Sequence, residues 1–190
     1  MRWTGDVDPL REPSRPMHTG PLNATPPAKI ILLTDRHTML AEMSTGNRRL
    51  SDVVNDPLRR HLTLENVRIN RSDRLDESVG SYAQVTVRRE AVQGVLIMSE
   101  PPRAPQQRLA SFVAKTPVRV AVLLPAMLIE GNVFVAGKAE AALQVLEGTE
   151  GFAVISDATV TLTHRSSGPI RVPTAMISRS HMELATIAAT

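Results

Sequence analysis

The feature that most constrains this 190-residue chain is an internal repeat. Three segments recur in the same order, at offsets of 91, 90 and 89 residues. A nearly constant period of this kind indicates two copies of one structural unit. The aligned segments are 61–69 with 152–160, 85–92 with 175–182, and 39–41 with 128–130.

Composition divides the chain into four parts. Residues 1–27 are rich in Pro, Thr, Ser and Arg without a hydrophobic period, which predicts an extended arm. Residues 28–100 form the first repeat and 116–190 the second. Between them, 101–115 is Pro-rich and basic, with Arg103, Arg108 and Lys115 and no acid, which predicts a linker.

Each repeat is predicted to consist mainly of strands. In the first repeat Val85 and Val87 alternate with polar neighbours, and 92–98 follows after a short connection, as in a hairpin. In the segment 61–69 the apolar alternation slips at Glu65–Asn66, which predicts a bulge. The second repeat has strand patterns in the same order.

One short helix interrupts each repeat. Leu50, Val53, Val54 and Leu58 have helical spacing, Ser51–Asp52 can accept backbone N–H groups at the start, and Pro57 ends the pattern. Residues 138–147 are strong helix formers followed by a glycine. About five strands and one short helix in some 70 residues suit a small, strongly bent barrel. We therefore expect a mainly β protein of two tandem small β-barrels with an extended N-terminal arm.

Composition also limits the chemistry. The chain has no cysteine, five aromatic residues and a net charge of +3, so thiol chemistry is excluded and stacking surfaces are disfavoured. Its five histidines lack metal-ligand spacing, and there is no phosphate-binding glycine loop or nucleophile elbow. We expect no catalytic, cofactor-binding or metal-binding residues and no enzyme activity. Without a signal-peptide core or spanning segment, we expect a cytoplasmic protein that does not insert into membranes.

Two short motifs of the first repeat resemble the Sm-like small β-barrel. Residues 60–67 (Arg-His-Leu-Thr-Leu-Glu-Asn-Val) resemble the third-strand motif of that family, and 87–92 (Val-Arg-Arg-Glu-Ala-Val) resemble its last hairpin. The whole unit, with Arg-Leu-Ser-Asp-Val-Val-Asn at 49–55, also resembles a bacterial domain family of unknown function. The first resemblance implies a site that holds a uracil base with an Asn and an Arg. Here His61 and Phe152 stand at the Asn position, and Arg89 replaces the Gly after the hairpin Arg.

The arginines of the first repeat are the strongest charged feature. Guanidinium groups suit phosphate oxygens, so this face is a candidate for nucleic acid or another anion. The alternative is an ordinary solvated surface, because eleven basic residues face ten acidic ones in this repeat, against five and six in the second. An anionic partner protein would use the same side chains. The candidate residues are Arg59, Arg60, His61, Arg88 and Arg89.

The N-terminal arm is the second candidate for binding. Trp3, the only Trp, lies with Leu10 and Leu22 in a segment that cannot form its own core, which favours anchoring to another subunit. Small open barrels also leave strand edges to be covered. We therefore expect a non-catalytic structural or accessory subunit that assembles with itself or within a larger complex, through strand edges and the arm. The alternative is an Sm-like nucleic-acid-binding module.

Overall fold

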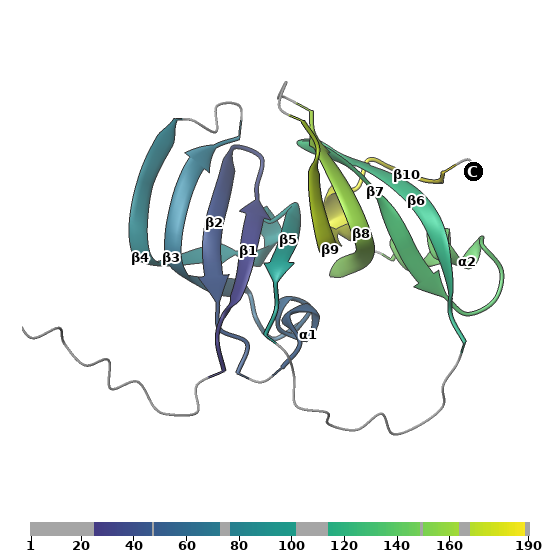
Figure 1. The fold of residues 1–190 in the computed structure, drawn as a ribbon, viewed down its shortest axis with the longest axis horizontal. Helices are drawn as coiled ribbons and strands as arrows, with labels where there is room; N and C mark the ends of the chain where they lie inside the picture. Colours follow the sequence, from purple (N-terminus) through teal and green to yellow (C-terminus); the bar gives the residue numbers. More distant parts are fainter. Residues whose placement is uncertain are drawn as a thin grey trace, which may run out of the picture.

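In the part of the chain that the structure describes, ten strands form one continuous antiparallel sheet (Figure 1). The structure, a computed structural model, describes residues 25–46, 48–72, 77–101, 114–148, 150–163 and 168–188. Within these residues the only other regular elements are two short α-helices and two 3-10 turns. The prediction of a mainly β chain is confirmed.

The two halves contain the same elements in the same order. The first half has β1 (Ala28–Leu33), β2 (His37–Met43), α1 (Leu50–Val54), β3 (His61–Arg71), β4 (Ser78–Arg88), the turn η1 (Arg89–Ala91) and β5 (Gly94–Ser99). The second has β6 (Thr116–Leu124), β7 (Met127–Val135), α2 (Ala141–Leu146), β8 (Phe152–Leu162), β9 (Ile170–Ser178), the turn η2 (Arg179–His181) and β10 (Leu184–Ile187). We call these halves the first and second repeat; the boundaries at 28–100 and 116–190 stay a prediction.

The two small barrels expected from the sequence are not confirmed. The strand order is β10-β6-β7-β8-β9-β5-β1-β2-β3-β4, so the last long strand of the second repeat pairs with the last strand of the first. Neither repeat closes on itself, because β5 uses its second edge to pair with β9 rather than with β4. The result is an open, curved sheet whose edge strands, β4 and β10, each have one edge without a partner strand among the described residues.

Strand pairing corrects one of the three repeat alignments. Leu33 pairs with Thr38 in the first repeat, and Leu123 pairs with Leu128 in the second. Leu33 and Leu123 are equivalent, because each accepts the N–H of the residue just before the last strand of its repeat. Met39 therefore corresponds to Ile129, at an offset of 90 rather than 89. Both side chains are buried, whereas a slip of one residue would turn them to the opposite face.

The predicted bulge lies at Asn66. Its φ is +50°, and the pairing of β3 with both neighbouring strands skips this residue. Asp157 occupies the equivalent place in β8, also with φ of +50°. Asn and Asp tolerate this left-handed conformation better than other residues with a side chain. The bulges bend both long strands at the same point of each repeat.

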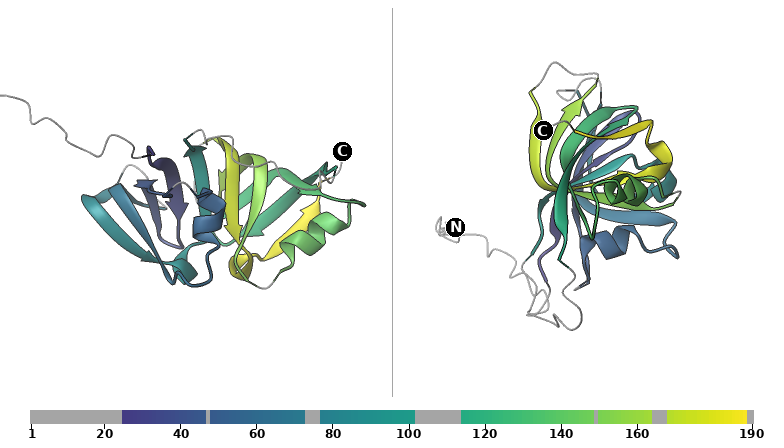
Figure 2. Two further views of the ribbon diagram at one scale, coloured as in Figure 1. Left: turned by 90° about the horizontal axis from the view of Figure 1, so that it is seen from below. Right: turned by 90° about the vertical axis from the view of Figure 1, so that its right-hand side faces the viewer.

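The first helix is shorter than its apolar pattern predicts. Leu50, Val53 and Val54 are buried, but the helix ends at Val54 and Leu58 is 91% exposed in the following loop. The expected cap by Ser51–Asp52 is also wrong: the Leu50 N–H is accepted by Glu100 Oε1 at 2.9 Å. In the second repeat the helix covers 141–146 of the predicted 138–147. Figure 2 shows both helices on the same face of the curved sheet.

The two hydrophobic cores interlock across the junction of the repeats. Phe152 and Met176 of the second repeat belong to the core of the first, and Leu33 and Leu96 of the first belong to the core of the second. All four side chains are buried. Neither repeat therefore has a complete core of its own.

Candidate functional site

The two repeats meet where β5 pairs with β9. Four residue pairs, from Gly94↔Ile177 to Ile97↔Thr174, continue the antiparallel ladder across the boundary. The Ser178 N–H extends it by donating to the Gln93 carbonyl oxygen at 2.8 Å. We call this contact the inner junction. Its ladder fixes the register of β5 against β9.

A pocket of about 600 Å³ lies beside the inner junction. It contains all five residues that the sequence singled out for anion binding, four arginines and His61, so the fold brings together groups that lie at the start of β3, the end of β4 and the turn η1. The second repeat supplies the opposite wall from the start of β8 and the end of β9. The pocket is lined by Pro57, Arg59, Arg60, His61, Arg88, Arg89, Glu90, Glu150, Gly151, Phe152, Ser178 and Ser180.

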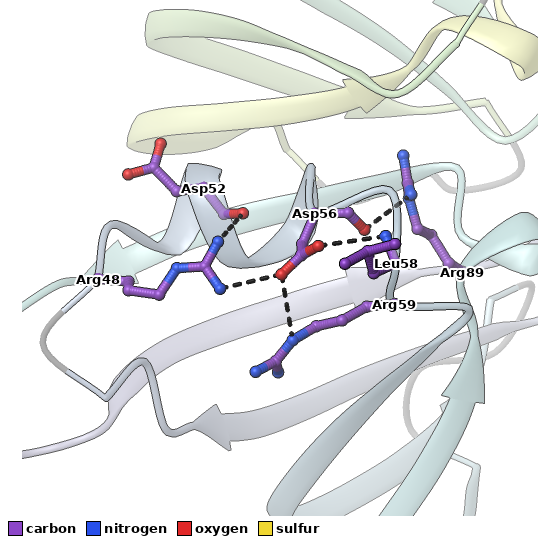
Figure 3. A network of polar contacts seen from close by, with 6 residues as sticks. All are labelled: Arg48, Asp52, Asp56, Leu58, Arg59 and Arg89. Atoms are coloured by element: carbon purple, nitrogen blue, oxygen red, sulfur yellow. Dashed lines mark hydrogen bonds and ion pairs between the residues drawn. The ribbon is translucent and has the colours of Figure 1, made fainter.

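Asp56 organises the loop that carries the first of these arginines (Figure 3). Its carboxylate accepts a hydrogen bond from Arg48 Nη1 at 2.9 Å and from the Leu58 N–H at 3.2 Å, and lies 3.7 Å from Arg59 Nε. The hydrogen bond from Arg48, followed by that from Leu58, lowers the pKa of this carboxyl from its ordinary 3.8. Asp56 is therefore charged at neutral pH, and it holds the Arg59 side chain beside the pocket.

Arg89 links the same loop to the second repeat. Its Nη1 donates to the Asp56 carbonyl oxygen at 3.1 Å, and its guanidinium carbon lies 5.9 Å from the centre of the Phe152 ring. This distance is within the range of a cation–π contact. Two of the four candidate arginines, Arg59 and Arg89, thus have structural partners.

The other three candidate residues are less constrained. Arg88 contacts Glu90 at 3.3 Å, but both side chains are more than 70% exposed, so the pair contributes little. Arg60 and His61 are exposed and make no side-chain hydrogen bond or ion pair within the described residues. Arg60, His61 and Arg88 can therefore bind an anionic oxygen without losing a strong internal contact.

The side-chain amide of Asn55 binds the backbone of Phe152 in the second repeat, a contact that we call the amide clasp. Asn55 Oδ1 accepts the Phe152 N–H at 2.7 Å and Asn55 Nδ2 donates to the Phe152 carbonyl oxygen at 3.2 Å. The neighbouring Gly151 has φ of +75°, and a Cβ there would lie 2.8 Å from Asn55 Oδ1. Glycine is required both by the conformation and by the approach of the amide.

Ser178 is the one buried hydroxyl in the pocket wall. Its Oγ lies 3.0 Å from Ser180 Oγ and 3.0 Å from His181 Nδ1. Within the described residues no carboxylate contacts the other ring nitrogen of His181, so this pair lacks the third group of a hydrolase triad. The described part of the chain also holds no cluster of three or more metal-ligating side chains. It contains no helix of the length and apolarity needed to cross a membrane; cytoplasmic localisation stays a prediction.

Some of the predicted binding residues lie elsewhere in the chain, and part of the site is not evident from the sequence. The predicted anchors Trp3, Leu10 and Leu22 lie outside the described residues. Asn55 and Gln93, which cross the inner junction, were not identified. No signal in the sequence identifies Asn55, because the sequence alignment of the repeats at offsets of 89 to 91 does not place an acid opposite it.

Comparisons with known proteins add no relative: no family model matches the chain, and neither a curated protein nor a solved structure is significantly similar to it. The resemblance to Sm-like barrels stays a prediction.

Asn55→Asp tests the clasp, because it keeps the shape and the acceptor but removes the donor to the Phe152 carbonyl oxygen. We expect a loss of about 1–3 kcal/mol in the free energy of unfolding, measured by urea denaturation, because a buried acceptor loses its partner. Gln144→Glu, an equivalent change on the exposed face of α2, is the control and should leave stability within about 0.5 kcal/mol. Equal stability of both variants would contradict the clasp.

Proposed function

We propose that this chain is a non-catalytic structural subunit that assembles head to tail with copies of itself through its two free sheet edges. The observation that carries the proposal is the inner junction. One chain already joins two similar units by pairing the last strand of one with the fourth strand of the other. The same two kinds of edge remain unpaired at the ends of the sheet.

The free edges are equivalent to the paired ones in register. His61↔Arg88 in the first repeat matches Phe152↔Ser178 in the second, so β4 corresponds to β9. Leu33↔Gly94 matches Leu123↔Leu184, so β10 corresponds to β5. An outer junction between two chains would therefore pair Leu184 with Val87 and Thr186 with Val85, and direct the Arg88 N–H to the Glu183 carbonyl oxygen.

Neither edge strand carries a Lys or a Pro, although β10 is short, with four residues. Edge strands that stay unpaired commonly carry Lys, Pro or inward-pointing charge. The β10 strand also has no charged residue. Val79 and Tyr82 on β4 are 50% and 48% exposed, and Leu184 on β10 is 52% exposed. In the outer junction Leu184 would gain Val87 as its cross-strand neighbour.

Such an interface is heterologous, because different edges of the two chains meet. Repetition of the contact gives a closed ring or a filament, depending on the rotation between successive chains. The predicted role of the arm as a strap between neighbours, through Trp3, Leu10 and Leu22, belongs to the same proposal. A larger complex would use the same edges.

Thr86→Pro tests edge pairing. The Arg88 N–H faces outward by equivalence with Ser178, and alternation along a strand directs the Thr86 N–H the same way. Proline removes this donor while sparing the ladder to β3, so we expect the variant to sediment as a monomer where the wild type forms oligomers. Thr86→Val, which keeps the N–H, is the matched control and should assemble. A monomeric wild type would contradict the proposal, as would unchanged assembly of the proline variant.

Anion binding in the pocket is a second candidate function. It is favoured by one observation, the convergence of Arg59, Arg60, His61, Arg88 and Arg89 on a single pocket. The opposite wall contributes two hydroxyls, but also the carboxylate of Glu150. A single-stranded nucleic acid would contact the cationic wall through its phosphates.

Oligouridine binding at two salt concentrations tests this candidate. If the pocket binds RNA through phosphates, affinity should fall at least about tenfold between about 50 and 200 mM salt. Arg59→Glu with Arg88→Glu should abolish retention at both concentrations. Arg68→Glu with Arg119→Glu, two exposed positions outside the pocket, are the control. Retention by the pocket variant equal to that of the control would exclude this function.

A further inference from the structure

Two side-chain amides form hydrogen bonds across the inner junction, in addition to its backbone ladder and the contact of Arg89 with the Phe152 ring. The Asn55 amide clasps the backbone of Phe152 beside Gly151. Gln93 Oε1 accepts the Ala126 N–H at 3.3 Å, while Gln93 Nε2 donates to Asp35. In each case the first repeat supplies a neutral amide and the second repeat supplies one of the two smallest residues.

Equivalent hydrogen bonds identify the counterparts of the two amides. The Asn55 N–H ends α1 by donating to the Ser51 carbonyl oxygen, and the Glu147 N–H ends α2 by donating to that of Leu143. The Gln93 N–H donates to the Leu33 carbonyl oxygen, and the Glu183 N–H donates to that of Leu123. Both amides are thus replaced by glutamates on the side of the molecule that carries β10.

The counterparts of the two small residues follow in the same way. The Gly151 carbonyl oxygen accepts the Arg179 N–H, and that of Arg60 accepts the Arg89 N–H. The Ala126 carbonyl oxygen accepts the Thr163 N–H, and that of Arg36 accepts the Ser72 N–H. Both small residues are thus replaced by arginines on the side that carries β4. The replacements occur in facing pairs. Where one repeat has a glutamate in place of an amide, the other has an arginine in place of the small residue opposite that amide.

We propose that the outer junction is closed by two ion pairs between successive copies of this chain, Glu147 with Arg60 and Glu183 with Arg36. The inference rests on the proposed head-to-tail assembly and specifies its contacts. A second copy is the partner, because the inner junction supplies the geometry and the two edges carry complementary charges.

The four side chains are free to form these pairs. All four are exposed, and within the described residues none makes a side-chain hydrogen bond or ion pair. The amide clasp itself cannot be repeated, because a side chain at the position of Gly151 would displace the amide. Glutamate and arginine instead reach each other with longer side chains and opposite charge.

Charged residues have an effect at the outer junction that is not required at the inner junction, because they guide the association of separate chains. The repeats of one chain are tethered, so they meet without steering. Separate chains are steered by complementary potentials, and like charges disfavour wrong pairings. Two β4 edges would bring arginines together, and two β10 edges would bring glutamates together. The ion pairs therefore enforce head-to-tail polarity.

Charge reversal on each side tests the inference. One variant carries Glu147→Arg and Glu183→Arg; the other carries Arg36→Glu and Arg60→Glu. Each alone should lose self-association by about tenfold or more at moderate ionic strength, because like charges then face each other. An equimolar mixture should assemble again, since each junction then joins opposite charges, and the four changes in one chain should also restore assembly. Analytical ultracentrifugation measures all of these, with circular dichroism confirming that each variant folds.

Matched controls separate this inference from the proposed function. Glu65→Arg with Arg68→Glu reverses two exposed charges on β3, which is not an edge strand, and should leave assembly unchanged. If the wild type assembles and Thr86→Pro prevents it, but the charge variants assemble like the control, the ion pairs are refuted and edge pairing stands. Failure of both the mixture and the fourfold variant to assemble also refutes the ion pairs. A wild type that is monomeric refutes both proposals.

Discussion

The pairing of β5 with β9 is the contact on which the rest of this structure depends. It turns two similar units into one sheet and lets each core take two buried side chains from the other repeat. It also builds the pocket, whose cationic wall comes from one repeat and whose apolar and hydroxyl wall comes from the other. By using one edge of each repeat, it decides which edges remain free.

The two repeats differ most where this contact would recur between chains. At the inner junction the side-chain hydrogen bonds between the repeats are made by the neutral amides Asn55 and Gln93, and Gln93 and Ala126 are buried. At the free edges the equivalent positions hold opposite charges, glutamates on one edge and arginines on the other. A buried charge without a partner is costly, whereas an exposed one guides association at little cost to the folded chain. The repeats thus differ in charge because the inner junction joins two units of one chain, whereas the proposed outer junction joins two separate chains.

Local pattern was sufficient to predict most elements of this fold. Alternation located the strands, and the slip at Glu65–Asn66 located a bulge that only residues tolerant of positive φ adopt readily. The barrels were not confirmed, because closure depends on which edge β5 pairs with, and no local pattern reports that choice. Leu58 was assigned to the helix by its spacing, yet the helix ends before it and the side chain is solvated.

Only part of the candidate site was predictable from the sequence, because local pattern shows residue types but not which distant residues meet. Arginines at strand ends are visible in the sequence, and the fold gathers Arg59, Arg60 and Arg88 into one pocket. Asn55 was not predicted, because its importance comes from a backbone 97 residues away in the chain. The paired replacements of amide by acid and of small residue by arginine acquire meaning only when the structure shows which positions face each other.

Cysteine crosslinking across the outer junction tests the central claim most directly, since the chain has no cysteine of its own. Val85 and Thr186 are equivalent to Ala175 and Leu96, a pair that alternation makes non-hydrogen-bonded, with Cα atoms about 4.5 Å apart. Val85→Cys with Thr186→Cys should therefore form intermolecular disulfides on mild oxidation. Ala83→Cys with Thr186→Cys, displaced by two residues along β4, should not. Equal crosslinking of the two variants, or none in either, would contradict the assembly register described here.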